Sequence, residues 1–299
     1  MIHRNETCNW QSPTIWMPTS LESAVEQMSQ LGSEARYISG GTLLQIQWEN
    51  GHRIPNHLIS LELIPSLKEV KLIEKDRFLA IGALTALAQC RKHPIIKAMH
   101  PIIGEAVRSV AAPAVRSLGT IGGNIMGGTG DLIPLLLAMK TELLIIHAFG
   151  EERIDMWQWL KQGERYERAL LMQVLLPVPV ASTDQRLFFK KIGRRESFIA
   201  AIVTVSGMIE KTELGSIGDI RLAVGGGDNK PILLERTGEL LRGKRMEDID
   251  WKAVYTSICN EFIPISDAFV TSDYRKKVAA NLLIAELKSR LSSDGEGRC

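Results

Sequence analysis

Apolar side chains recur at helical spacing near the start of the chain, between Leu21 and Leu31. Ser20 stands where an N-cap would lie and Gly32 follows as a stop, so the pattern predicts one helix over this run. The next apolar pair, Tyr37 and Ile38, predicts a short strand, because aromatic and β-branched residues favour extended backbone. Two glycines interrupt it, and another helical pattern begins directly after them.

Short apolar runs and helical patterns continue to alternate along the next hundred or so residues. The apolar runs predict strands at His57–Leu61, Leu67–Ile73, Phe78–Ile81, Thr141–His147 and Leu170–Leu176. Helical spacing predicts a helix that begins within Thr85–Cys90, another over Ile102–Val110 and a third directly before Thr141. The pattern therefore predicts a protein of mixed helices and strands.

The pattern changes from Thr183 onward, where residues 187–210 predict a strand, a turn and a strand. A further strand after Ile217 ends in glycines, and helical spacing returns at Glu235–Leu241 and Asp273–Leu291. The proline-bearing stretch "PVPVAST" places a domain boundary near residue 180.

Composition narrows the class of protein without naming it. A length of 299 residues favours about two domains, and 45% apolar with 23% charged residues is typical of a soluble globular protein. A formal net charge of +2 argues against a nucleic-acid binder. The N-terminus shows no apolar signal region, and no apolar stretch is long enough to span a bilayer, so we expect a cytoplasmic protein.

The cysteines do not suggest a metal centre on this chain. None belongs to a C-x-x-C pair, and they are widely separated at Cys8, Cys90, Cys259 and Cys299. Zinc sites and iron–sulfur clusters usually take closely spaced ligands. We therefore predict free thiols in a reducing compartment, no metal ligands here, and any metal redox centre on another chain.

Two glycine-rich turns are the candidate binding elements, "ISGGTLL" at Ile38–Leu44 and "TIGGN" at Thr120–Asn124. Consecutive amides in such turns can form a concave nest of donors, and a helix N-terminus adds partial positive charge. Together they could hold a diphosphate without a lysine or an arginine. Neither turn fits G-x-G-x-x-G or G-x-x-x-x-G-K-[ST], so the standard dinucleotide and P-loop folds are disfavoured. Tight turns without a ligand remain the alternative.

Five motifs in order carry a resemblance to a known family: "YISGGTLL", "SLGTIGGNIMG", "DLIP", "FFKKIGRRESF" and "LAVGGGDNKP". They resemble the FAD-binding medium subunit of molybdenum hydroxylases, which include xanthine dehydrogenase and carbon monoxide dehydrogenase. The resemblance runs from about residue 10 to about residue 290.

The resemblance implies an α+β fold, with a two-subdomain PCMH-type (vanillyl-alcohol-oxidase-like) FAD-binding domain followed by a smaller α+β domain of the carbon monoxide dehydrogenase flavoprotein C-terminal type. The implied ranges are residues 1–62 and 63–180 for the FAD-binding subdomains, 181–292 for the C-terminal domain and 293–299 for a polar tail.

The resemblance also implies a noncovalent FAD site. The first turn would wrap the diphosphate, the second would close over it, Asp131 would bind sugar-like hydroxyls, Leu171 would line the flavin pocket and Lys190 would approach the flavin. The implied cofactor-binding residues are Ile38, Ser39, Gly40, Gly41, Thr42, Leu43, Leu44, Thr120, Ile121, Gly122, Gly123, Asn124, Asp131, Leu171 and Lys190.

Two departures from the family stand out. The stretch between Asn124 and Asp131 is shorter than in many relatives, which weakens the assignment of roles within it. Some eukaryotic relatives place an aromatic residue beside the flavin just before the second turn, whereas Arg108–Ser117 contains none. Access of other molecules to the flavin would then be controlled in another way in this chain than in those relatives.

The resemblance implies an electron-transfer role. A molybdopterin-binding large subunit would oxidise the substrate, 2Fe-2S clusters on a small subunit would pass electrons to the FAD on this chain, and NAD would be reduced. The flavin would supply the chemistry, so no general acid or base is expected among these residues. We favour xanthine dehydrogenase of purine catabolism, which converts xanthine, NAD and water to urate and NADH.

Several alternatives remain open. The complex could instead oxidise carbon monoxide, nicotinate or an aromatic thioester of coenzyme A, because another chain chooses the substrate. The chain could be a stand-alone FAD reductase of the same fold, or an assembly protein whose glycine turns bind nothing. For Arg194, Arg195 and Glu196 a solvated turn is the simpler interpretation, although a partner or a nicotinamide cofactor could contact them.

Overall fold

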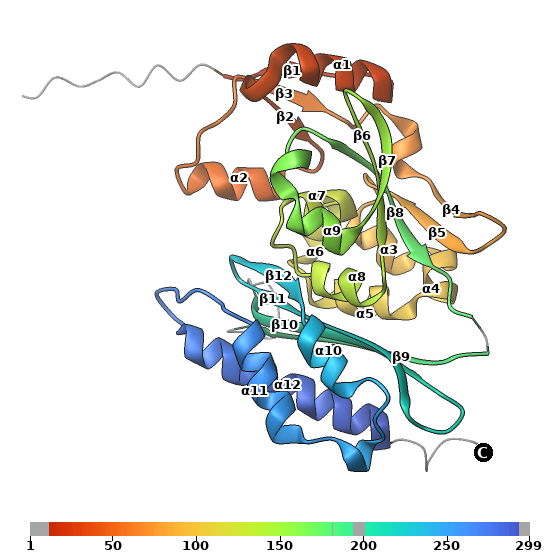
Figure 1. Cartoon of the computed structure of the whole chain (residues 1–299). Coiled ribbons are helices and arrows are strands. Elements are labelled where there is room, and N and C mark those ends of the chain that lie inside the picture. Colours follow the sequence, from red (N-terminus) through yellow and green to blue (C-terminus); the bar gives the residue numbers. More distant parts are fainter. Residues whose placement is uncertain (1–11, 181, 194–200, 293–299) are drawn as a thin grey trace, which may run out of the picture.

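The computed structural model describes residues 12–180, 182–193 and 201–292, and Figure 1 shows their arrangement. Arg194, Arg195, Glu196 and the cysteines at positions 8 and 299 lie outside the described residues. A small parallel sheet at the N-terminal end has the strand order β1-β3-β2. Its elements are β1 (Thr14–Trp16), α1 (Leu21–Leu31), η1 (Gly32–Glu34), β2 (Ala35–Ile38), α2 (Thr42–Glu49) and β3 (His57–Ser60).

A five-stranded antiparallel sheet follows, with the strand order β4-β5-β8-β6-β7. After η2 (Pro65–Lys68), its strands are β4 (Val70–Ile73), β5 (Phe78–Gly82), β6 (Glu142–His147), β7 (Gly150–Asp155) and β8 (Leu170–Pro177). Short α9 (Met156–Lys161) and η3 (Gly163–Tyr166) connect β7 to β8.

Six short helices lie between β5 and β6, and most of them contribute buried residues to the same core as this sheet (Figure 1). They are α3 (Leu87–Lys92), α4 (Pro94–Met99), α5 (Pro101–Ser109), α6 (Pro113–Leu118), α7 (Ile121–Met126) and α8 (Ile133–Ala138). Proline opens α4, α5 and α6, and a proline cannot continue a preceding helix. The sequence therefore breaks this region into short helices whose ends and connections can line a cleft.

The C-terminal part is an antiparallel sheet of order β12-β11-β10-β9. In Figure 1, α10, α11 and α12 cover one face of this sheet, while α5 and α8 from the preceding part cover the other. Its elements are β9 (Asp184–Gly193), β10 (Ala201–Lys211), β11 (Ile217–Gly226), β12 (Asn229–Leu233), α10 (Glu235–Leu241), η4 (Met246–Asp248), α11 (Trp251–Glu261) and α12 (Ser272–Ser292).

Side chains of β9 point alternately into two different hydrophobic cores. Leu187 and Phe189 pack against the core of the five-stranded sheet and its helices, whereas Phe188 between them is buried in the core beneath α12. Successive side chains of a strand point to opposite faces, so neighbours in the sequence enter different cores. By the same rule, Lys190 and Lys191, which follow on this strand, point to opposite faces of the sheet.

The local predictions succeed where sequence signals are strong. The first helix occupies Leu21–Leu31, and the Ser20 hydroxyl caps it by accepting a hydrogen bond from the Ser23 amide. The predicted strand at Leu67–Ile73 begins only at Val70, because Pro65–Lys68 form a turn of 3-10 helix. The predicted turn at Thr120–Asn124 is instead the beginning of α7.

Candidate functional site

The two glycine-rich stretches, at residues 38–44 and 120–124, are distant in the sequence and adjacent in space. The first links β2 to α2, and the second begins α7. The hydroxyl oxygens of Ser39 and Thr120 lie 3.2 Å apart and share a hydrogen bond. Both residues line the same cleft.

The cleft has two lobes that meet at this contact. A first lobe of about 360 Å³ lies between β2 and the start of β8. A second lobe of about 400 Å³ lies between α2, the α5–α6 connection and the loop after α7, and includes Gly227 and Asp228 from the C-terminal part. The junction residues, which line both lobes, are Arg36, Tyr37, Ser39, Thr120, Gly123 and Met126. This shape suits an elongated ligand with a group at each end and a polar middle.

The first glycine pair leaves amides open to the cleft. Gly41 is the N-cap of α2 with a φ of 68°, a conformation that a β-carbon disfavours. Gly40 is glycine for another reason, because a β-carbon there would lie 1.9 Å from the carbonyl oxygen of Leu118. No side chain caps α2, and the first-turn residues 42–44 line the second lobe. Their N–H groups, which a helix cannot pair internally, are available to a ligand.

The second glycine pair does not form a nest of free donors, and that part of the prediction is wrong. The amide of Ile121 donates to the Thr85 carbonyl at 3.0 Å, and the amide of Gly122 donates to the Ala83 carbonyl at 2.9 Å. The amides of Gly123 and Asn124 donate at 3.0 Å to Thr120, through its side-chain hydroxyl and its carbonyl respectively. The second stretch therefore presents the Thr120 hydroxyl and a bare Gly123 surface to the cleft.

Most of the predicted residues line one lobe or both, but Ile121 and Lys190 do not. Ile121 is fully buried in the hydrophobic core beneath α7. Leu171, on β8, is 3% exposed and lines the first lobe. Asn124 lines the second lobe, but its side-chain oxygen accepts the Leu132 amide at 3.2 Å, so it also closes the short loop that precedes Asp131.

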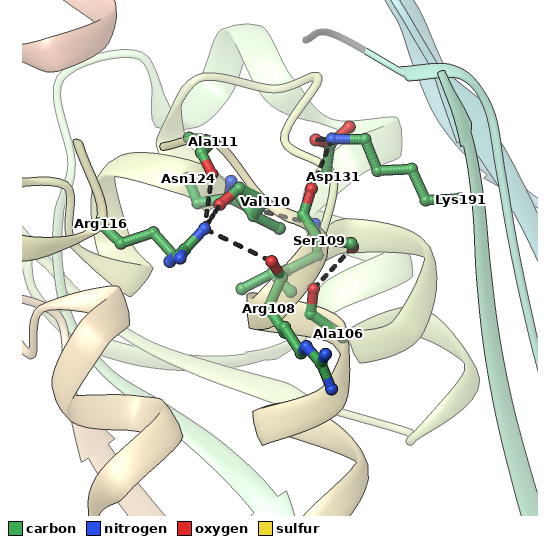
Figure 2. A network of polar contacts seen from close by, with 10 residues as sticks. Ala106, Arg108, Ser109, Val110, Ala111, Arg116, Asn124, Asp131 and Lys191 are labelled. Carbon is green, nitrogen blue, oxygen red and sulfur yellow. Dashed lines mark hydrogen bonds and ion pairs between the residues drawn. The ribbon is translucent and has the colours of Figure 1, made fainter. Parts of the chain in front are cut away.

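The lysine that contacts a cleft residue is Lys191 and not Lys190. The ammonium of Lys191 lies 2.6 Å from the Asp131 carboxylate and 3.0 Å from the Ser109 carbonyl oxygen, and its side chain is 6% exposed (Figure 2). The Lys190 side chain is half exposed on the opposite face of the sheet, 3.3 Å from Glu286 of α12. The strand alternation seen at Phe188 and Phe189 explains the difference.

Arg36 is a site residue that sequence reasoning missed. It is exposed, lies at the junction and precedes the first glycine pair by four positions. Its neighbour Tyr37 donates to the Ala24 carbonyl at 3.4 Å, and burial raises the pKa of the Tyr37 hydroxyl. The only sequence signal was a basic residue in the strand before the turn, which is common on any protein surface.

The residues of the cleft fit FAD by their chemistry. Open amides at the start of α2, which line the second lobe, and the guanidinium of Arg36 at the junction suit a diphosphate. Asp131 uses one carboxylate oxygen for Lys191, which leaves the other to accept hydroxyl hydrogen bonds. The two lobes have space for ring systems at either end.

Other kinds of site receive no support from the described residues. Within residues 12–180, 182–193 and 201–292, no group of three or more histidine, cysteine or acidic side chains could hold a metal ion. Burial raises the pKa of the Cys90 thiol to about 12, so this thiol stays neutral. No helix in the described part of the chain is both long enough and apolar enough to cross a bilayer.

Comparison with known proteins agrees with this geometry. Residues 9–179 match the family "FAD binding domain in molybdopterin dehydrogenase", and residues 188–289 match "CO dehydrogenase flavoprotein C-terminal domain". The carbon monoxide dehydrogenase medium chain of Afipia carboxidovorans is 27% identical over 276 residues, which cover 89% of this chain and 92% of that one. Xanthine dehydrogenase of Drosophila subobscura is 22% identical over 316 residues, which cover 99% of this chain but 23% of that protein.

A solved structure of carbon monoxide dehydrogenase from Hydrogenophaga pseudoflava, lacking the Mo-pyranopterin moiety of its cofactor, shares the fold. The TM-score is 0.83 at 22% identity, and the match covers 94% of this chain and 98% of that chain. The two family matches together cover nearly all of the described residues. The chain therefore belongs to the family of FAD-binding domains of molybdopterin dehydrogenases, with a carbon monoxide dehydrogenase flavoprotein C-terminal domain attached.

Proposed function

We propose that this chain is the FAD-carrying electron-transfer subunit of a multi-subunit molybdenum hydroxylase. The observation that carries the proposal is the two-lobed cleft whose polar junction is built from both glycine-rich stretches. The family match over residues 9–179 supports FAD as the ligand.

The chain's own residues bind and orient the cofactor. The amides of residues 42–44 and the side chain of Arg36 hold the diphosphate, with the hydroxyls of Ser39 and Thr120 beside it. Asp131, fixed by Lys191, accepts hydrogen bonds from sugar-like hydroxyls. Bound FAD supplies the transfer of electrons between partner and acceptor.

The experiment that tests this part is a measurement of flavin on the purified chain. We expect about one FAD per chain, and we expect acid precipitation to release it into the supernatant, since the binding is noncovalent. A chain that stays colourless after incubation with excess FAD contradicts the proposal. Flavin that stays with the precipitate contradicts noncovalent binding only.

We propose that the partners are a molybdopterin-binding large subunit and a small subunit with 2Fe-2S clusters. The relative from Afipia is called a medium chain, which is consistent with a subunit of intermediate size in a larger assembly. Co-purification of two further chains with molybdenum and iron tests this assignment. A monomeric chain that reduces its own substrate would support a stand-alone reductase instead.

For the complex we propose xanthine as substrate and NAD as acceptor, and the match to a xanthine dehydrogenase supports this choice. The carbon monoxide dehydrogenase relative, which is matched over nearly its whole length, favours a second candidate of that class. The discriminating assay reconstitutes the three subunits and follows NADH formation with xanthine, with carbon monoxide and with nicotinate as parallel substrates. NADH formed with only one of the other substrates removes xanthine and leaves the flavin assignment intact.

A further inference from the structure

Four consecutive carbonyl groups, at the end of α5 and in its connection to α6, face cationic side chains (Figure 2). The guanidinium of Arg116 donates to the Val110 carbonyl at 2.9 Å and lies 3.4 Å from the Arg108 carbonyl. The same nitrogen also donates to the Ala111 carbonyl. Lys191 takes the remaining carbonyl, that of Ser109, at 3.0 Å. Two cations thus bond the carbonyls of residues 108–111, while the Ala112 carbonyl accepts the main-chain amide of Arg116 at 2.9 Å.

Arg116 is a buried cation whose described partners are main-chain carbonyls rather than carboxylates. Its exposed fraction is 8%, and the described residues form no ion pair with it. Burial and the neighbouring charge of Arg91 lower the pKa of this guanidinium, which nevertheless stays protonated. By contrast, the charge of Lys191 is balanced by Asp131. The cation that bonds the carbonyls of the connection without a carboxylate partner among the described residues is therefore Arg116.

The other side of the connection faces the cleft. Val110 and Ala111 line the second lobe, whereas Arg116 does not. In a trans peptide the N–H points opposite to the C=O, and the described residues contain no cis peptide bond. The amides of Ala111 and Ala112 therefore point away from Arg116, and the described hydrogen bonds give neither amide a partner. Ala111 also has a φ of 48°, an unusual conformation for a residue with a β-carbon.

We propose that the N–H group of Ala111 donates to the electron-rich edge of the flavin ring, which would then occupy the second lobe and not the first lobe, which Leu171 lines, and that Arg116 behind this peptide is a positioning residue that favours the reduced cofactor. This inference rests on the proposed FAD site. A carbonyl bonded to a cation polarises its peptide group, which strengthens the N–H on the other side. Fixed donors of this kind act most strongly where negative charge develops.

The absence of an aromatic residue in this connection agrees with such a role. Small side chains at Val110, Ala111 and Ala112 let the main chain approach a planar ring closely. A bulky side chain in their place would hold the amides away from it. The second lobe would thus recognise the ring through the backbone.

Reduction potentials of FAD bound to the full-length chain test the proposal. Arg116→Gln keeps a donor for one carbonyl but removes the charge, so it should fold and still bind oxidised FAD. We expect its affinity for reduced FAD, relative to oxidised FAD, to fall at least tenfold, which for a two-electron couple equals about 30 mV toward more negative potential. Arg116→Lys restores the charge and should recover most of this loss.

Arg108→Met is the matched control, because it removes an exposed cation from the same connection and leaves the contacts of Arg116 in place. It should leave the potential within error of the wild-type value. Stoichiometric FAD at the wild-type potential in Arg116→Gln would show that Arg116 only anchors the connection, and would overturn the proposal. A wild-type chain that binds no FAD is a separate result, since it overturns the proposed function itself.

Discussion

The glycine pairs at 40–41 and 122–123 look alike in the sequence and line the same cleft, the first directly before a helix and the second inside the first turn of another. Their backbones differ. The first pair precedes an uncapped helix whose opening amides face the second lobe, whereas the amides of the second pair are already paired with Ala83 and Thr120. A glycine pair thus marks a place where other atoms approach the backbone closely, and a glycine pair does not reveal whether those atoms belong to a ligand or to the protein itself. Only the first pair exposes a row of donors.

The largest expected effect comes from the two glycines that touch protein backbone. A β-carbon at Gly40 would lie 1.9 Å from the Leu118 carbonyl oxygen, and one at Gly122 would lie 2.7 Å from that of Ala83. We expect Gly40→Ala and Gly122→Ala each to lower the free energy of unfolding by about 3 kcal/mol, because backbone must shift to relieve the overlap. Urea denaturation measures the change. Gly163→Ala, where the nearest other atom is 4.0 Å away, is the control and should stay near wild type.

The next largest effect is expected at the ion pair between Lys191 and Asp131. Lys191→Met leaves Asp131 without its ion-pair partner and frees the Ser109 carbonyl, so we expect a loss of about 2 kcal/mol of stability and weaker FAD binding. Lys190→Met removes the same charge one position earlier, at a half-exposed pair with Glu286, and should cost under about 0.5 kcal/mol. Thermal unfolding of both variants measures the loss of stability, and titration with FAD measures the change in affinity. Equal effects would mean that Lys191 has no special role.

A more selective effect on FAD is expected at the glycines of the junction and the α2 cap. Gly41→Val forces a branched side chain at a φ of 68°, and a β-carbon at Gly123 would crowd the hydroxyls of Thr120 and Ser39 at 3.2 and 3.4 Å. We expect each valine to weaken FAD binding about tenfold, or about 1.4 kcal/mol. Gly51→Val controls for backbone strain, since Gly51 also has a positive φ of 87° but touches nothing nearby. Full flavin retention in both cleft variants would show that the diphosphate site is misassigned.

The smallest effect isolates the hydroxyl at the junction. Thr120→Val keeps the shape of the side chain but loses the cap on the Gly123 amide and the contact with Ser39. We expect about 1 kcal/mol less stability and a severalfold weaker affinity for FAD, whereas Thr120→Ser should restore both. Isothermal titration with FAD, alongside urea denaturation, separates the two quantities. A Thr120→Val variant with wild-type affinity would limit the ligand contacts to the first stretch.

Much of the cleft was accessible from the sequence, because local signals fix local geometry. Ser20 and Gly32 bound the first helix, and the glycines before Thr42 mark the uncapped start of α2. Asp131, predicted from the motif order, lines the second lobe. Lys190 was predicted to approach the flavin, yet its side chain pairs with Glu286 of α12, because a one-residue difference on a strand exchanges the faces and motif matching does not resolve which face a lysine takes. Arg36 was missed because an exposed basic residue carries no local signature.

The sequence by itself determined the mixed helix and strand character, which follows from apolar periodicity. It also determined where prolines divide the helices and where the two glycine-rich stretches lie, because these follow from the backbone preferences of single residues. Tertiary structure alone decided which amides stay free, which of two adjacent lysines reaches Asp131, and that Arg116 lies behind the Val110–Ala111 carbonyls. Those outcomes depend on contacts between segments far apart in the chain. The backbone preference of a residue does not determine which distant carbonyl will accept its hydrogen bond in the folded chain.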